Sequence, residues 1–169
     1  HFVVARGHDV GTGHHHRCRH LARVLGHHWV TTFEVSVPRV PPQAVYATDA
    51  DVYVFDCLEV PTDLLLAAKA RGKVVVLEDE GADSGRLADL RVNEMLDPAD
   101  LKYAVLREEF CCLPPREHVE IGRKILVTFG GTDPANLTER VARQLGSVDV
   151  RVIRPGESTS MAREMREAD

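Results

Sequence analysis

The chain has 169 residues, of which 44% are hydrophobic and 28% are charged, and its formal net charge is −5. This composition is typical of a soluble globular protein with one ordinary domain or two small ones. Acidic and basic residues are interspersed, which argues against a general nucleic-acid or anionic-membrane binder, because such proteins need a basic face.

Membrane insertion is not expected, because every apolar run is far shorter than the roughly 20 residues that cross a bilayer. The expected location is therefore the cytoplasm, and the interspersed charges favour a small molecule as partner. The four cysteines form no C-x-x-C pair, so we interpret them as reduced thiols. The chain begins at His1 without a methionine and closes on a helical pattern, and we therefore expect it to be cut at one or both ends. No oligomeric state is predicted.

The first half of the chain alternates between predicted strands and helices. A β-branched strand at 2–5 leads into a glycine loop and a helix that ends at Gly26. The other elements expected here are a strand at 30–37, a buried strand at 52–56, a helix capped by Thr62 that stops at Gly72, a buried strand at 73–77 and a short strand at 90–93. This alternation predicts an α/β domain with a parallel sheet.

The second half begins with a short predicted strand at 102–106 and a proline-containing linker at 114–123. A strand from residue 124 then leads through a glycine loop into a helix, with Asp133 as N-cap, Pro134 at the first helical position and Gly146 just past the end. A strand at 148–153 and a final helix capped by Ser158 or Ser160 complete the pattern. We thus predict two Rossmann-like domains, 1–113 and 124–169, facing each other across a cleft.

The segment GTGHHHRCRHLA, residues 11–22, is the first candidate site. Gly11 and Gly13 would let a phosphate or sugar approach the backbone at a helix N-terminus, where unpaired N–H groups favour anions. His14 falls in the first helical turn and Arg17 follows one turn later. Histidine is a good general base near neutral pH, and the helix N-terminus favours its neutral form. The glycines could equally serve only as a loop.

A metal site is the alternative for the same segment. His16 and His20 share a helix face at i,i+4 spacing, and His14, His15 and Cys18 lie close to them in the sequence. The cysteines do not have zinc-finger spacing. Asp56, Glu78 and Asp79 follow strands, where they would either bind sugar hydroxyls or serve as caps and loop residues.

A second glycine loop, Gly130-Gly131-Thr132-Asp133, has the same strand-loop-helix context without a histidine. It could hold the diphosphate of a nucleotide, or it could simply be a capped helix start. Farther back, Arg107 and Glu109 flank the linker, where either a ligand contact or an ion pair between the domains fits them.

Three segments in order carry a family resemblance. GTGHHHRCRHLA resembles the G-x-G-H-x-x-R-C-x-x-L-A motif of the UDP-sugar hydrolases of pseudaminic acid biosynthesis and of the related spore-coat polysaccharide biosynthesis proteins. KYAVLREEF, residues 102–110, is similar to their Y-x-x-L-R-x-E-F segment, and ILVTFGGTDPANLT, residues 125–138, is similar to the opening of their second domain. The resemblance covers the chain from Gly11 to Thr138.

This resemblance implies a GT-B fold, like that of the glycosyltransferase MurG, with the second domain incomplete. It implies that water displaces UDP from the anomeric carbon with inversion, without a cofactor or metal. The site residues that it implies are the catalytic His14; Gly11, Gly13, Arg17, Asp56 and Arg107 for the substrate; and Gly130, Gly131, Thr132 and Asp133 for the nucleotide. The alternatives are a glycosyltransferase of the same fold and a binding or assembly subunit that lacks the nucleotide site.

Overall fold

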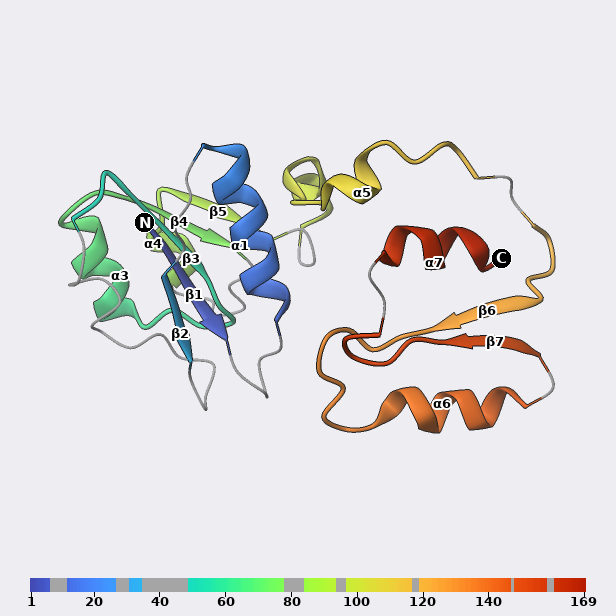
Figure 1. The fold of residues 1–169 in the computed structure, drawn as a ribbon. Coiled ribbons are helices and arrows are strands. Elements are labelled where there is room, and N and C mark those ends of the chain that lie inside the picture. Colours follow the sequence, from blue (N-terminus) through green and yellow to red (C-terminus); the bar gives the residue numbers. More distant parts are fainter. Residues whose placement is uncertain are drawn as a thin grey trace. The chain divides into compact units, whose positions relative to one another are not determined.

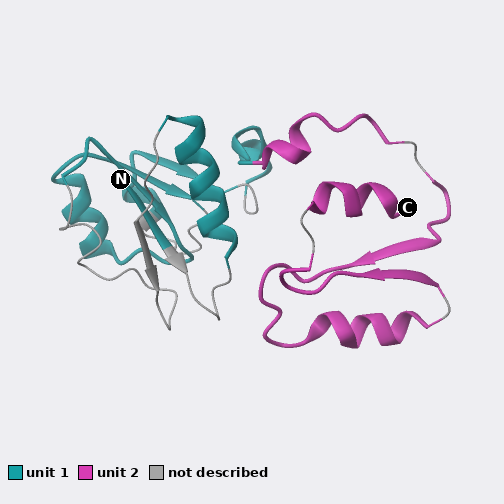
Figure 2. Cartoon of the chain, viewed as in Figure 1, with its two compact units in different colours: residues 1–105 teal, residues 106–169 magenta. Residues whose placement is uncertain are grey.

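A computed structural model gives the structure of the chain in two compact units. It describes residues 1–6, 12–26, 31–34, 49–77, 84–93, 97–116, 119–146, 148–157 and 160–169. The units are His1–Val105 and Leu106–Asp169 (Figure 2). Each has its own parallel strands and its own buried side chains, so we describe each separately.

The first unit is built on a five-stranded sheet in which every neighbouring pair is parallel. Its strands are β1 (Phe2–Arg6), β2 (Thr31–Glu34), β3 (Val52–Asp56), β4 (Lys73–Leu77) and β5 (Leu90–Val92), in the order β2-β1-β3-β4-β5. The last four residues of β3 are all buried. Such continuous burial is what a parallel sheet covered on both faces requires, and it confirms the strands predicted from apolar runs.

Helices cover both faces of this sheet (Figure 1). On one face, helix α1 (Gly13–Val24) packs its buried Cys18 and Ala22 against a cluster that includes Phe2 and Val4. On the other face, α3 (Thr62–Lys69) packs Leu64, Leu65 and Ala68 against Val3, Tyr53 and Phe55, and Leu87 of α4 (Ser84–Leu87) joins this second cluster. Because neighbouring residues of a strand point to opposite faces, β1 contributes to both clusters. The result is a mixed α/β unit that is compatible with a Rossmann-like fold.

The strand order places a crossover reversal beside β1. The chain leaves β1 through α1 to reach β2 on one side, and β3 lies on the other side of β1. In open parallel sheets, ligands bind outside the carboxyl ends of the strands at such a reversal, because the loops there separate and leave a crevice. The register pairs Val4 of β1 with Asp56 at the end of β3, so both strands reach this edge together.

The second unit is smaller. Strands β6 (Lys124–Val127) and β7 (Asp149–Val152) form a parallel pair joined through α6 (Leu137–Leu145), and α7 (Met161–Glu167) follows; in Figure 1 the strands lie between the two helices. A short helix, α5 (Glu108–Cys111), precedes them. The buried side chains that the structure describes in this unit are Val127, Thr138, Ile153 and Ala162. The strand-helix-strand order agrees with the prediction for this half.

One predicted strand is wrong. Residues 102–106 were expected to be extended, but the chain forms a 3-10 helix, η1 (Pro98–Tyr103), and none of its residues is buried. The cause is local: Pro98 stands at the helix start, and the Asp97 carboxylate caps the turn by accepting the Ala99 N–H at 2.9 Å. The apolar residues near Tyr103 therefore do not reflect a sheet position.

Two helix starts also differ from the prediction. Helix α6 begins at Leu137, three residues later than Pro134, because Asn136 adopts a left-handed conformation with φ of 51°. Thr62 is the first residue of α3 and not its cap, and Pro61 occupies the cap position. Ser160 does cap α7, by accepting the Arg163 N–H at 3.3 Å.

Two predicted boundaries also differ from those in the structure: the ends of the strand at 30–37 and the end of the first domain. Strand β2 covers only the centre of the predicted range 30–37, and the rest of that range lies outside the described residues. The first unit ends at Val105, earlier than the predicted boundary at residue 113, because α5 joins the second unit: Glu109 accepts hydrogen bonds from Ser160 and from the Ala162 N–H. A search of the described helices for one long and apolar enough to span a bilayer found none.

Candidate functional site

His14 lies at the carboxyl edge of the first unit's sheet. Helix α1 begins at Gly13, so His14 is its second residue and stands in the turn whose N–H groups have no partner within the helix. The Thr12 side chain makes no capping bond. The imidazole is largely buried, with 9% of the side chain exposed. The sequence prediction of a histidine at a helix N-terminus is therefore confirmed.

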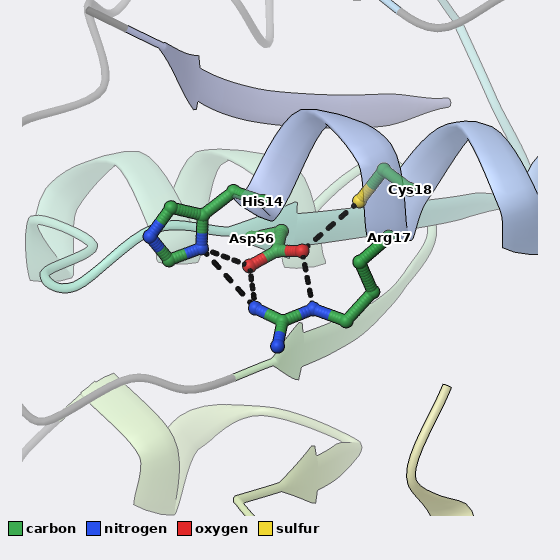
Figure 3. A network of polar contacts seen from close by, with 4 residues as sticks. All are labelled: His14, Arg17, Cys18 and Asp56. Carbon is green, nitrogen blue, oxygen red and sulfur yellow. Dashed lines mark hydrogen bonds and ion pairs between the residues drawn. The ribbon is translucent and has the colours of Figure 1, made fainter. Parts of the chain in front are cut away.

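Asp56 brings three side chains of α1 together (Figure 3). Its Oδ1 lies 2.6 Å from Nδ1 of His14 and 2.6 Å from a terminal guanidinium nitrogen of Arg17. Its Oδ2 accepts a hydrogen bond from Nε of Arg17 at 2.8 Å and from the Cys18 thiol at 3.3 Å. Arg17 thus binds the carboxylate through two parallel N–H groups, which is the strongest geometry for this pair of groups.

The spacing along α1 explains how three of its residues reach one carboxylate. Residues three and four positions apart lie on the same face of a helix, so Arg17 and Cys18 follow His14 on the side that meets the end of β3. Asp56 itself is fully buried as the last residue of β3. The parallel register of β1 and β3 then fixes the distance between helix and carboxylate.

The electrostatics of this cluster depend on its charged pair. Burial alone would raise the pKa of Asp56, but the hydrogen bonds from His14 and Arg17 and the positive charge of Arg17 outweigh it, so the pKa of this carboxyl lies below its usual value. Burial raises the pKa of the Cys18 thiol strongly, and the neighbouring Asp56 charge raises it further. Asp56 is therefore an anion, and Cys18 is a neutral hydrogen-bond donor that is unsuited to act as a nucleophile.

The histidine run as a whole is not gathered at one point. His16 is exposed on the surface of α1, whereas Cys18 is buried against Asp56. Among the described residues, no group of three or more histidine, cysteine, aspartate or glutamate side chains has an arrangement that could hold a metal ion. Within that part of the chain, the metal alternative finds no geometric support; it was considered for His14, His15, His16, Cys18 and His20.

The other residues predicted in this half are placed as follows. Gly11 lies outside the described residues, as do Glu78 and Asp79. Gly13 opens α1, and a Cβ atom there would meet none of the described residues within 4 Å. The fold therefore does not require a glycine at position 13, which leaves room for a ligand as the reason for it.

Arg107 belongs to the second unit and is half exposed. Its guanidinium lies 2.7 Å from the Glu109 carboxylate and 4.9 Å from the centre of the Phe110 ring. Both contacts are local, since Arg107 caps α5 and the other two residues lie in the first turn of that helix. Neither supports the predicted ion pair between domains, and the predicted substrate contact of Arg107 stays a prediction.

The second glycine loop joins the carboxyl end of β6 to α6. Gly130 and Gly131 are exposed, and Gly130 has a φ of 78°, which only glycine adopts without strain. Asp133 accepts the N–H groups of Leu137 at 2.8 Å and of Thr138 at 3.0 Å. The Thr138 hydroxyl and these N–H groups lower the pKa of Asp133. The Asp133 carboxylate therefore accepts the first N–H groups of α6, but Asn136 occupies the cap position that was predicted for Asp133. Thr132 is half-buried.

Sequence reasoning missed the link between the strand and the helix. It identified His14, Arg17 and Asp56 separately and assigned the latter two to the substrate, but it did not predict that they bind one another. It considered Cys18 only as a metal ligand and as part of the motif, and did not predict its hydrogen bond to Asp56. The sequence did contain a signal for this link: Asp56 is an acidic residue at the end of the buried strand β3. The carboxyl ends of neighbouring parallel strands meet at one edge of a sheet, so a strand beside β1 would bring its last residue close to the loop that follows β1.

The arrangement provides a histidine held against a buried carboxylate at a sheet edge where ligands bind. Enzymes commonly use a histidine paired with a carboxylate to accept a proton when water or a hydroxyl group attacks a substrate.

In comparisons with known proteins, no family model matches the chain and no curated protein shows significant similarity to it.

Proposed function

We propose that this protein processes a nucleotide-linked sugar and, in the simplest case, hydrolyses a UDP-linked amino sugar. One observation carries the proposal: His14, at the N-terminus of α1 and at the crossover reversal of a parallel sheet, lies 2.6 Å from a fully buried carboxylate. The motif resemblance of residues 11–22 supplies the substrate class. In this proposal the two units are the Rossmann-like halves of a GT-B enzyme.

The proposed reaction needs one base and one leaving group. The oxygen of a water molecule forms a bond to the anomeric carbon from the face opposite the diphosphate, and the bond from that carbon to the diphosphate oxygen breaks. His14 takes the proton that the water loses, and UDP leaves with the bonding electron pair as an oxyanion. The N–H groups at the N-terminus of α1, where the helix dipole is positive, are suited to stabilise negative charge that develops beside them.

For the second unit, we propose that the backbone of Gly130 and Gly131 approaches the nucleotide. Support comes from the place of this loop, between the carboxyl end of a parallel strand and a helix, and from the exposure of both glycines. Asp133 is a poorer candidate for direct contact, because both of its oxygens accept N–H groups of α6. Its contribution would be to hold the loop in shape.

The test is the release of UDP from a UDP-linked amino sugar by the full chain. His14→Ala is expected to lower the rate by about 10²- to 10⁴-fold, the usual contribution of a general base. His16→Ala is the matched control, because His16 stands on the same helix with an exposed side chain. Equal rates for wild type and His14→Ala would refute the proposal.

A glycosyltransferase is the second candidate, since a histidine backed by a carboxylate can remove a proton from an acceptor hydroxyl as well as from water. Analysis of products with and without sugar acceptors separates the two reactions. If adding an acceptor yields a glycosylated acceptor and less free sugar, the result favours the transferase. Binding of UDP without any turnover would favour the remaining alternative, a binding or assembly subunit.

A further inference from the structure

Asp56 is saturated by its protein partners. Among the described residues, each of its two oxygens has two contacts: Oδ1 with His14 and Arg17, and Oδ2 with Arg17 and Cys18. An ionised carboxylate offers about four lone-pair sites in total. Because the side chain is also fully buried, the carboxylate has neither the surface nor the acceptor capacity to bind a sugar hydroxyl, the role that the sequence predicted.

The contact between Asp56 and His14 indicates which ring nitrogen carries the proton. A carboxylate only accepts hydrogen bonds, so an approach of 2.6 Å by Nδ1 requires a proton on that nitrogen. A guanidinium nitrogen of Arg17 also lies 3.2 Å from Nδ1, and this donor would favour the opposite tautomer. The contact with Asp56 is the shorter of the two, and the same Arg17 nitrogen is bound to Oδ1 at 2.6 Å. The carboxylate therefore decides the tautomer.

The second nitrogen of the ring is then the reactive one. In a neutral imidazole that carries its proton on Nδ1, the lone pair resides on Nε2. Figure 3 shows Nε2 on the side of the ring turned away from Asp56 and Arg17. The His14 ring retains some exposure, whereas the carboxylate behind it has none.

We propose that Asp56, held by Arg17 and Cys18, is the positioning residue of this site and fixes His14 in the tautomer with the proton on Nδ1, so that Nε2 accepts the proton in the reaction. This inference deepens the proposed function and rests on it for the identity of the reaction. Arg17 becomes part of the same support, because it neutralises the buried carboxylate and orients it. Neither residue then needs to touch the substrate.

The direct test is nitrogen NMR of the full chain with ¹⁵N-labelled histidine, at about pH 8, where an ordinary imidazole is neutral. His14→Gln identifies the His14 signals by their loss. We expect His14 to populate the Nδ1–H tautomer almost completely, and the exposed His16 of the same helix to show the mixture typical of a free ring. A predominantly Nε2–H form at His14 in the wild type would overturn the inference without need of any further variant.

Two variants separate the carboxylate from general packing. Asp56→Asn leaves one oxygen acceptor, for which Arg17 competes, and places an NH₂ donor in the cluster; we expect the Nδ1–H preference to be lost. Cys18→Ala removes one donor to Oδ2 and leaves the contacts of Oδ1 in place, so the wild-type tautomer should persist. Unchanged populations in Asp56→Asn, or equal changes in both variants, would refute the assignment.

The activity assay tells this inference apart from the proposed function. If UDP is released, Asp56→Asn should lower kcat by about 10²- to 10⁴-fold with little change in KM, since positioning acts on the transition state. A wild type with the Nδ1–H tautomer but without UDP release would refute the hydrolysis and leave the positioning intact. UDP release by a wild type in the Nε2–H form would refute the positioning alone.

Discussion

At the scale of single residues, the site combines a largely buried base with an ion pair whose carboxylate is fully buried. Arg17 binds Asp56 through two N–H groups, and this pairing offsets much of the cost of placing a carboxylate at 0% exposure. Removing one partner of such a pair leaves the other charge buried without compensation. The cluster is therefore a point on which the stability of the first unit depends, in addition to its proposed role in the reaction.

The stability contribution of Asp56 is expected to depend on pH. Its pKa in the folded chain lies below the ordinary 3.8, so the ionised form stabilises the fold above about pH 4 and this contribution is lost as the pH falls through the folded pKa. Near neutral pH, Asp56→Asn should lower the free energy of unfolding by about 3 to 5 kcal/mol. The difference from wild type should shrink as the pH falls from about 5 to 2. Urea unfolding at a series of pH values measures it, and a difference that stays constant would contradict the prediction.

The four cysteines should differ sharply in reactivity. Cys111 ends α5, Cys112 follows it, and both are exposed, whereas Cys18 and Cys57 are fully buried. The raised pKa of Cys18 also reduces its thiolate fraction. Alkylation of the native protein followed by peptide mass spectrometry should label the exposed pair first, and the buried pair only after unfolding. Early labelling of Cys18 would contradict both its burial and its contact with Asp56.

At the scale of elements, the turn between α3 and β4 depends on a glycine for close packing. A Cβ atom at Gly72 would lie 2.5 Å from the carbonyl oxygen of Ala50 and 2.6 Å from that of Asp51. Both are backbone atoms just before β3, so neither can move without shifting the strand that carries Asp56. The close contact between Gly72 and the backbone just before β3 therefore helps to fix the position of the strand that ends in Asp56.

We expect Gly72→Ala to lower the free energy of unfolding by about 1 to 3 kcal/mol, the usual cost of overpacking. Gly13→Ala is the matched control, because a Cβ there meets no atom of the described part of the chain within 4 Å, and its effect should stay below about 0.5 kcal/mol. Thermal or denaturant unfolding of both variants checks this. If Gly13 serves ligand approach as proposed, Gly13→Ala should nevertheless lower kcat/KM. Equal stability of the two variants would contradict the argument from packing.

At the scale of the whole molecule, the two units differ in how much they bury. Four of the five residues of β3 are buried, whereas the residues of β7 alternate between exposed and half-buried. A parallel pair with so little coverage gains little from burial. We therefore expect the first unit to be the more stable part of the described chain. It carries the cluster of His14, Arg17, Cys18 and Asp56.

Hydrogen exchange should report this difference. We expect the backbone amides of β7 to exchange roughly tenfold or more faster than those of β3 and β4, because local opening costs less where few side chains are buried. Exchange followed by mass spectrometry of peptides from each strand measures the two rates in one experiment. Equal protection of β3 and β7 would show that burial in the described residues does not govern opening.

By itself, the sequence determined the local features of this protein. Apolar runs predicted β3 and β4 within a residue of their ends, glycine punctuation predicted α1, and the Gly-x-Gly-His order placed a histidine at a helix N-terminus. These features depend on residues near one another in the chain, where periodicity and capping act directly. Prediction was weakest where local signals competed, as at η1 and at the start of α6.

Only the tertiary structure decided what surrounds His14. Asp56 lies 42 positions farther along the chain, and it reaches the imidazole because β3, and not β2, lies on that side of β1. The order of strands in a sheet follows from long-range packing, which no local pattern of residues encodes. The sequence therefore supplied the base, and the fold supplied the carboxylate that orients it.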